Sequence, residues 1–111
     1  MQWKISYYSK NVQEDILSFP PGIKARYIHC TKLMIEFGPN LREPHTKAMG
    51  DGLFELRLKS QEGIARVLYC PFIGQTITVL HCFIKKSQKI PRKELETARK
   101  RMKEVKKHVN P

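Results

Sequence analysis

Hydrophobic residues alternate with mostly polar ones over residues 2–8, which predicts a strand with one buried face. Asn11 and Glu14 have the spacing of a helix N-cap and its N3 partner, so we expect a short helix to begin there. The segment FPPG then ends this helix, because proline cannot continue it.

A second helix has the clearest periodicity in the chain. Hydrophobic positions recur at spacings of four, three, four and three residues, at Ile23, Tyr27, Cys30, Met34 and Phe37. Such a stripe is the buried face of an amphipathic helix, and the Gly-Pro pair that follows is a typical helix end. Two helices joined by a tight proline–glycine link are expected to form a helical hairpin.

Three strand-like runs come after residues 39–51, whose proline, glycine and polar content predicts an exposed loop. The runs are LFELRLK at 53–59, IARVLYC at 64–70 and TITVLHCFI at 76–84. Short connections favour an antiparallel meander, and Pro91 suits the first turn of a terminal helix. We therefore expect a single α+β domain over residues 1–111, with an N-terminal strand, a helical hairpin on one face of the sheet, a three-stranded antiparallel meander and a C-terminal helix.

The distribution of charge says more about function than the rest of the amino-acid composition does. The chain has 21 Lys and Arg against 10 Asp and Glu, a net charge of +11. Residues 84–111 alone hold eleven Lys and Arg and three Glu, so most of the excess lies in the C-terminal quarter. Such a concentration attracts polyanions through long-range attraction and counterion release. The alternative is a solvated helix face that only aids solubility.

Cysteine use and hydropathy exclude several classes of protein. Cys30, Cys70 and Cys82 are too few and too scattered for a disulfide framework and form no C-x-x-C pair, so we expect buried thiols and no metal site. No segment approaches the roughly 18 to 20 apolar residues that cross a bilayer. Residues 1–10 lack the pattern of a secretory signal, so we expect a cytoplasmic protein without membrane contact.

Strand parity gathers basic residues on one surface. Arg57 and Glu55 share the polar face of the first of the three runs. Arg66 interrupts the second run, where unpaired burial would be costly, so it should lie on an open face or meet a carboxylate. Lys85 and Lys86 leave the third run, and one of them can converge with the two arginines on a concave surface. This patch suits a phosphodiester, because Arg offers bidentate donors and Lys a compact charge.

If the ligand is RNA, the same groups could also cleave it. The ribose 2′-hydroxyl is an internal nucleophile, and a site must align it and stabilise charge on the phosphorane. Proton transfer would fall to a lysine or arginine with a perturbed pKa, or to Glu55. Each residue also has a structural reading: Glu55 and Arg57 as cross-strand ion-pair partners, His81 as a core histidine, and His45 as a loop residue. The nuclease hypothesis would fail if Arg57, Arg66 and Lys86 pointed in unrelated directions or were all held in interior ion pairs.

The chain from residue 49 to residue 104 resembles the RelE/ParE toxin superfamily, specifically its phage-derived HigB-like branch. The resembling features are Gly-Asp-Gly-Leu before Glu55-Leu56-Arg57, Gly63-x-x-Arg66-Val67-Leu68-Tyr69, Phe83-x-Lys85-Lys86, and a helix that is led by Pro91 and contains Ala98. The first 48 residues match mainly in their order of strand and helical hairpin.

The resemblance implies the toxin of a type II toxin–antitoxin pair, which enters the ribosomal A site and cuts messenger RNA without a metal or organic cofactor. It places the catalytic basic positions on Arg57, Arg66 and Lys86, with Lys85 beside the last and Glu55 as a further candidate. Residues that would hold ribosomal RNA and message are Lys47, Lys89, Arg92, Arg99, Lys100 and Lys103. The implied partners are the ribosome with its message and a neutralising antitoxin, often a helix-turn-helix protein.

Two other functions stay open at this point. One is a non-enzymatic gyrase poison like those of the ParE arm, since a shared fold does not determine function. The other is a basic RNA-binding module without catalysis. Some relatives carry a tyrosine or histidine in the last segment, where this chain has Gln88 and Ile90 and its only late histidine is His108. The resemblance therefore assigns no general acid or base.

Overall fold

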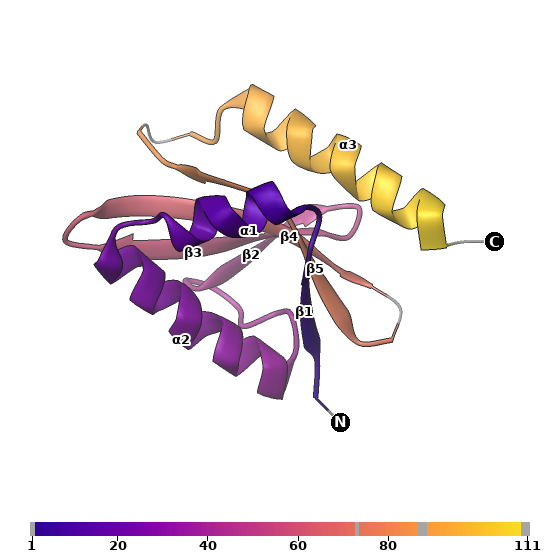
Figure 1. The fold of residues 1–111 in the computed structure, drawn as a ribbon, viewed down its shortest axis with the longest axis horizontal. Helices are drawn as coiled ribbons and strands as arrows, with labels where there is room; N and C mark the ends of the chain where they lie inside the picture. Colours follow the sequence, from indigo (N-terminus) through magenta and orange to yellow (C-terminus); the bar gives the residue numbers. More distant parts are fainter. Residues whose placement is uncertain (1, 73, 87–88, 110–111) are drawn as a thin grey trace.

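The computed structural model describes residues 2–72, 74–86 and 89–109. Within them, the elements follow in the order β1 (Lys4–Tyr7), α1 (Lys10–Leu17), α2 (Pro21–Phe37), β2 (Thr46–Gly50), β3 (Leu53–Ser60), β4 (Gly63–Phe72), β5 (Thr76–Ile84) and α3 (Arg92–Val109). The strands form a sheet in the order β1-β5-β4-β3-β2 (Figure 1). The expected α+β class, with its helical hairpin and C-terminal helix, is confirmed.

The strand β2 is an element that the hydrophobic pattern did not reveal. Residues 46–50, expected to belong to an exposed loop, pair antiparallel with β3, with Thr46 opposite Leu56 and Lys47 opposite Glu55. An edge strand pairs on one side and most of its side chains are not buried, so no hydrophobic alternation marks it. The antiparallel meander therefore has four strands, β2 to β5, rather than three, and β1 joins β5 in parallel.

The start of α1 also differs from the expectation. Ser9, rather than Asn11, is the N-cap, because its extended backbone lets its Oγ accept the N–H of Val12 at 3.2 Å. The helix α2 begins with Pro21 at its first position and ends at Gly38, whose φ of 103° favours glycine.

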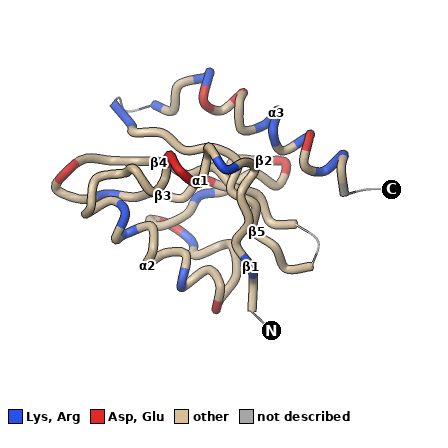
Figure 2. The backbone as a smooth tube through the Cα atoms, in the orientation of Figure 1, with Lys and Arg blue, Asp and Glu red and all other residues tan. Residues whose placement is uncertain are grey.

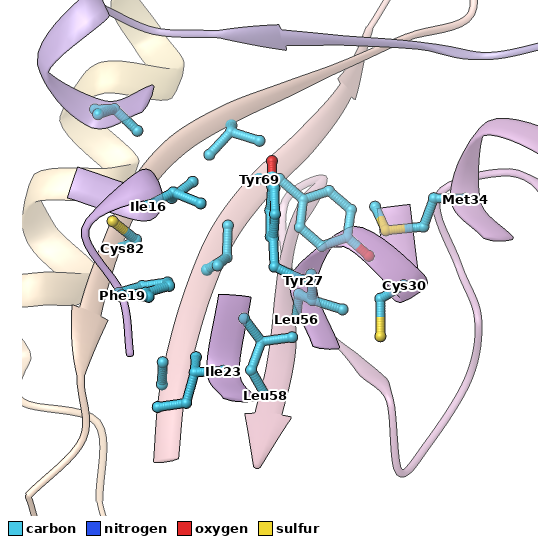
Figure 3. Packing of buried hydrophobic residues seen from close by; sticks show 14 of the residues in the cluster. Ile16, Phe19, Ile23, Tyr27, Cys30, Met34, Leu56, Leu58, Tyr69 and Cys82 are labelled. Atoms are coloured by element: carbon cyan, nitrogen blue, oxygen red, sulfur yellow. The ribbon is translucent and has the colours of Figure 1, made fainter. Parts of the chain in front are cut away.

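The two N-terminal helices cover one face of the sheet. Ile23, Tyr27, Cys30 and Met34 of the predicted stripe are buried in a cluster with strand residues such as Leu56 and Tyr69 (Figure 3). Phe37, expected in the same stripe, is 69% exposed, because it lies in the last turn of α2 beyond Met34, the last helix residue of that cluster.

The helix α3 packs on the opposite face. Ala98 and Met102 are buried against Leu53, Leu68 and Leu80 of the strands. These strand residues lie near one end of the sheet, and the same face continues beyond them with polar and charged positions of β3 and β4. The sheet thus has one largely apolar face and a second face that α3 covers only in part.

The three cysteines are free, buried thiols, as expected. Burial raises the pKa of Cys82 to about 12, so this thiol is protonated at neutral pH. None of the helices in the described ranges combines the length and hydropathy that spanning a membrane requires.

Candidate functional site

Three neighbouring strands place basic side chains on the face that α3 leaves open. Arg57 of β3 is the Cα partner of Arg66 of β4, which in turn pairs with Phe83 of β5. Side chains alternate between the faces of a strand, so Lys85, two residues after Phe83, returns to the face of the two arginines. The backbone N–H of Lys85 donates to the carbonyl oxygen of Ile64 at 2.8 Å, which extends the β4–β5 ladder to this residue.

The two adjacent lysines have different surroundings. Lys85 is partly buried and lies beside Arg57 in two hollows of the surface, whereas Lys86 is exposed and lines neither. Burial is the main cause that lowers the pKa of Lys85, and the charge of Arg66 adds to it while Glu55 opposes it. The resemblance placed the catalytic lysine on Lys86, but the geometry brings Lys85 to the arginines.

Glu55 lies between the two arginines. Its side chain is 2% exposed; Oε1 accepts a hydrogen bond from Nε of Arg57 at 3.1 Å, and Oε2 lies 3.4 Å from Nε of Arg66. The second contact is an ion pair without hydrogen-bond alignment, so Nε of Arg66 is buried with no hydrogen-bond partner in the described structure. The structural reading of Glu55 as an ion-pair partner is thereby confirmed. A carboxylate so enclosed orients the guanidinium groups.

These ion pairs leave positive charge in excess. Arg66 is 7% exposed, and burial lowers its pKa although Glu55 opposes the shift. The side chain of Arg57 is one-third exposed and also lies 3.7 Å from Glu43, a carboxylate at the surface. One buried carboxylate thus faces two guanidinium groups, and Lys85 adds a third cation that makes no ion pair within the described ranges. Arg66 acts from below the surface, whereas Arg57 and Lys85 can present charge to a ligand.

Two adjoining hollows make this surface concave. The larger, of about 450 Å³, is lined by Arg57, Arg66 and Lys85 together with Arg26, His45 and Lys59, among others. The smaller, of about 280 Å³, is lined by Arg57, Lys85, Glu55, Lys47 and Lys89, among others. A separate hollow of about 260 Å³ lies beside Tyr8 and Val105, and the described residues that line it include no lysine or arginine.

Among the polar residues that line the larger hollow, sequence reasoning missed Arg26, His45 and Lys59. Arg26 comes from α2, and only the packing of that helix brings it to the strands. His45, expected to be an ordinary loop residue, lines the hollow, and its carbonyl oxygen accepts the N–H of Arg57 at 2.8 Å. Its position follows from the pairing of β2 with β3, so recognition of β2 in the sequence would have found it.

His81, expected to be a satisfied core histidine, has polar partners on both ring nitrogens but is half-buried rather than in the core. Its Nε2 is 3.0 Å from Oε1 of Glu94, and its Nδ1 is 3.4 Å from Nη1 of Arg101. Arg101 can only donate, so Nδ1 accepts and Nε2 carries the proton toward Glu94. This histidine fastens α3 to the sheet and lines neither of the two hollows.

The residues predicted to hold RNA have several kinds of surroundings. Lys47 and Lys89 line the smaller hollow, and Arg92, Lys100 and Lys103 are exposed on α3, where Figure 2 shows basic and acidic positions interspersed. Arg99 differs, because its Nη2 donates to the carbonyl oxygen of Met49 at 2.7 Å and its Nη1 lies 3.6 Å from Asp51. Its guanidinium connects α3 to the β2–β3 turn. RNA contact by all six residues stays a prediction.

Comparison with known proteins identifies a matching family and solved structures of similar fold. Residues 14–103 match the model of the family described as phage derived protein Gp49-like. No curated protein sequence matches the chain. Among solved structures, the chain is similar to an arginine-to-alanine double mutant of the E. coli toxin RelE in the free state, with a TM-score of 0.66, 12% identity, and coverage of 92% of this chain and 99% of that one.

A second solved structure has the same fold. It is the archaeal RelE–RelB complex from Pyrococcus horikoshii, with a TM-score of 0.55, 20% identity, and coverage of 76% of this chain and 96% of the matched chain. At these identities the likeness concerns the fold, and it confirms the expected RelE-like architecture. The family match covers most of the chain, from α1 into α3. It includes every residue that lines the two hollows, which together are called the basic site. The chain is therefore a member of the phage-derived Gp49-like family and has the fold of the RelE toxin superfamily.

Proposed function

We propose that the protein is the toxin of a type II toxin–antitoxin system and cleaves messenger RNA on the ribosome, in the cytoplasm and without a metal or organic cofactor. The observation that carries this proposal is the convergence of Arg57, Arg66 and Lys85 around Glu55 on an open, concave sheet face. The RelE-like fold supports the toxin assignment, and the matched RelE–RelB complex supports a cognate antitoxin, such as a helix-turn-helix protein, as the inhibitory partner.

The proposed reaction uses the RNA's own 2′-hydroxyl. Its oxygen attacks the adjacent phosphorus, the bond from phosphorus to the 5′-oxygen breaks, and the products are a 2′,3′-cyclic phosphate and a 5′-hydroxyl. The attacking hydroxyl loses a proton to a base, and the leaving oxygen gains one from an acid. Between these events the phosphorane carries extra negative charge, which fixed cations stabilise.

The geometry suggests a role for each group. Arg57 presents its guanidinium to the phosphate oxygens, and Glu55, itself paired with Arg66, holds it in place. Lys85, whose pKa is lowered, is suited to give its proton to the leaving 5′-oxygen. His45 is the imidazole in the lining of the larger hollow and is the candidate base for the 2′-hydroxyl. Glu55 is a positioning residue in this scheme.

The exposed basic residues of α3 would hold the surrounding RNA. Arg92, Lys100 and Lys103 project from the helix surface, where contacts to phosphates add affinity without sequence preference. Arg99 would contribute indirectly, by fixing α3 against the β2–β3 turn.

The test is to express the protein in a bacterial host and map the 5′ ends of cellular messages. We expect new ends within translated regions, which disappear in Arg57→Ala and when translation initiation is blocked. Lys32→Ala, an exposed lysine of α2 outside the hollows, is the matched control. Intact messages during growth arrest, with induction of the DNA-damage response, would replace the proposal with a gyrase poison.

A second candidate is a phosphate-binding module without catalysis. It is favoured by the burial of Arg66 and Glu55, which withdraws two of the five candidate catalytic residues from direct contact with a ligand. In that case the protein would bind RNA with a salt dependence that falls in Arg57→Ala, and expression would produce neither new message ends nor growth arrest.

A further inference from the structure

Arg57 and Lys85 line both hollows of the basic site. On β3, Glu55, Arg57 and Lys59 occupy alternate positions of one face. Glu55 lines the smaller hollow, Lys59 lines the larger, and Arg57 belongs to both. The hollows therefore follow one another along β3, where side chains on the same face are about 7 Å apart. Arg57 and Lys85 form the cationic ridge between them.

Each hollow has apolar or aromatic side chains in its lining beside the cations. In the larger hollow, the partly buried side chain of Ile64 and the exposed imidazole of His45 contribute to the lining. In the smaller, Met49 and Ile90 do so, and both also pack against the cluster under α3. Apolar and aromatic groups beside a cation suit a nucleoside whose phosphate is held at the cation, since every base has a face that stacks or packs.

We propose that the two hollows are separate nucleoside subsites, so that the protein takes one dinucleotide step of single-stranded RNA with its bridging phosphate on the Arg57–Lys85 ridge. One nucleoside lies beside His45 and Ile64, and the other beside Met49 and Ile90. The two bases are unstacked from one another, because the ridge stands between them. The proposal rests on the proposed function for the identity of this phosphate as the one that is cut, but the binding mode itself needs no ribosome.

The probe is a dinucleotide with a 2′-O-methyl group on the 5′ nucleoside, which blocks the internal nucleophile, and its binding is measured by titration calorimetry or NMR. Two further probes lack the 5′ base or the 3′ base, and inorganic phosphate is the reference for the ridge alone. Stacking and packing of a base contribute about 1–3 kcal/mol, so we expect each missing base to weaken binding by roughly 5- to 150-fold.

Variants assign the bases to the hollows. His45→Ala should weaken binding of the intact dinucleotide. It should not weaken binding of the probe that lacks the base bound in the larger hollow, because that probe makes no contact there to lose. Met49→Ala and Ile90→Ala should behave in the same way toward the other probe. His29→Ala and Ile28→Ala, exposed positions on α2 outside both hollows, are the matched controls. Thermal unfolding of each variant identifies any loss of folding, and either of the Met49 and Ile90 variants suffices for the smaller hollow.

Several results would overturn the subsites. Binding of the dinucleotide no tighter than inorganic phosphate, or equal losses in both abasic probes for every hollow variant, would show that the ridge alone binds. This outcome is distinct from failure of the proposed function. Base-dependent binding with intact cellular messages would leave the subsites standing without the nuclease, whereas message cleavage with base-independent binding would do the reverse.

Discussion

Arg57 and Arg66 lie opposite one another across the β3–β4 ladder, and the buried carboxylate of Glu55 faces the Nε atoms of both. Two guanidinium groups at neighbouring positions of a sheet repel one another, and neither can lose its proton at physiological pH. Glu55 therefore makes the arrangement stable, and the surplus of cations makes it a site for an anion.

Replacement of Glu55 should destabilise the fold. Glu55→Gln keeps the shape but leaves Arg66 buried without a counter-charge, so we expect the free energy of unfolding to fall by about 3 kcal/mol. Urea unfolding monitored by circular dichroism measures it. Glu96→Gln, which removes the exposed partner of Arg92, should cost well under ~1 kcal/mol. Similar losses in the two variants would show that Glu55 does not stabilise the arginines.

The adjacent lysines should differ in their effect on cleavage. Lys85→Ala removes the proposed proton donor at the ridge, so we expect the rate of message cleavage to fall by roughly 10²-fold or more. Lys86→Ala, which removes an exposed lysine outside both hollows, should change it by no more than a few-fold. Cleavage of a reporter message in a reconstituted translation reaction provides both rates. A larger loss in the Lys86 variant would return the catalytic role to the position that the resemblance indicated.

The lowered pKa of Lys85 has a consequence for stability. The pKa of Lys85 in the folded state lies below the ordinary value of 10.5. Between the two pKa values, the unfolded chain therefore binds this proton more readily than the folded chain does. The charged Lys85 therefore destabilises the fold at neutral pH, and this effect disappears above the unfolded value. At pH 7, the melting temperature of Lys85→Met should equal or exceed that of the unmodified protein. The difference between the two melting temperatures should be smaller near pH 11. Lys86→Met controls for the loss of a neighbouring lysine, and a variant of Lys85 that melts lower at pH 7 would contradict the expectation.

Two neighbouring residues of α3 should separate stability from RNA binding. Arg99→Ala removes the hydrogen bonds to the β2–β3 turn and should lower the free energy of unfolding by about 1–2 kcal/mol. Lys100→Ala should leave stability within ~0.5 kcal/mol and reduce the salt dependence of RNA binding by about one phosphate contact. Chemical unfolding and binding at several salt concentrations distinguish the two. The division of roles fails if Lys100→Ala leaves the salt dependence unchanged.

Local patterns in the sequence determined most of the elements. The spacing of Ile23, Tyr27, Cys30 and Met34 identified α2 and its buried face, because a helix returns the same face every three or four residues. Alternation identified β3 and put Glu55 and Arg57 on its polar face, and short apolar runs between turn residues identified β4 and β5. These predictions depend only on neighbours in the chain, and the structure confirms them.

The tertiary structure decided what depends on pairing between distant segments. The strand β2 exists because β3 offers its backbone, and that pairing brings His45 to Arg57. The β4–β5 register brings Lys85 rather than Lys86 to the two arginines, and Arg26 reaches the larger hollow only through the packing of α2. The sequence shows which residues are basic, but hydrogen bonds between strands and the burial of helices determine which of them share one surface.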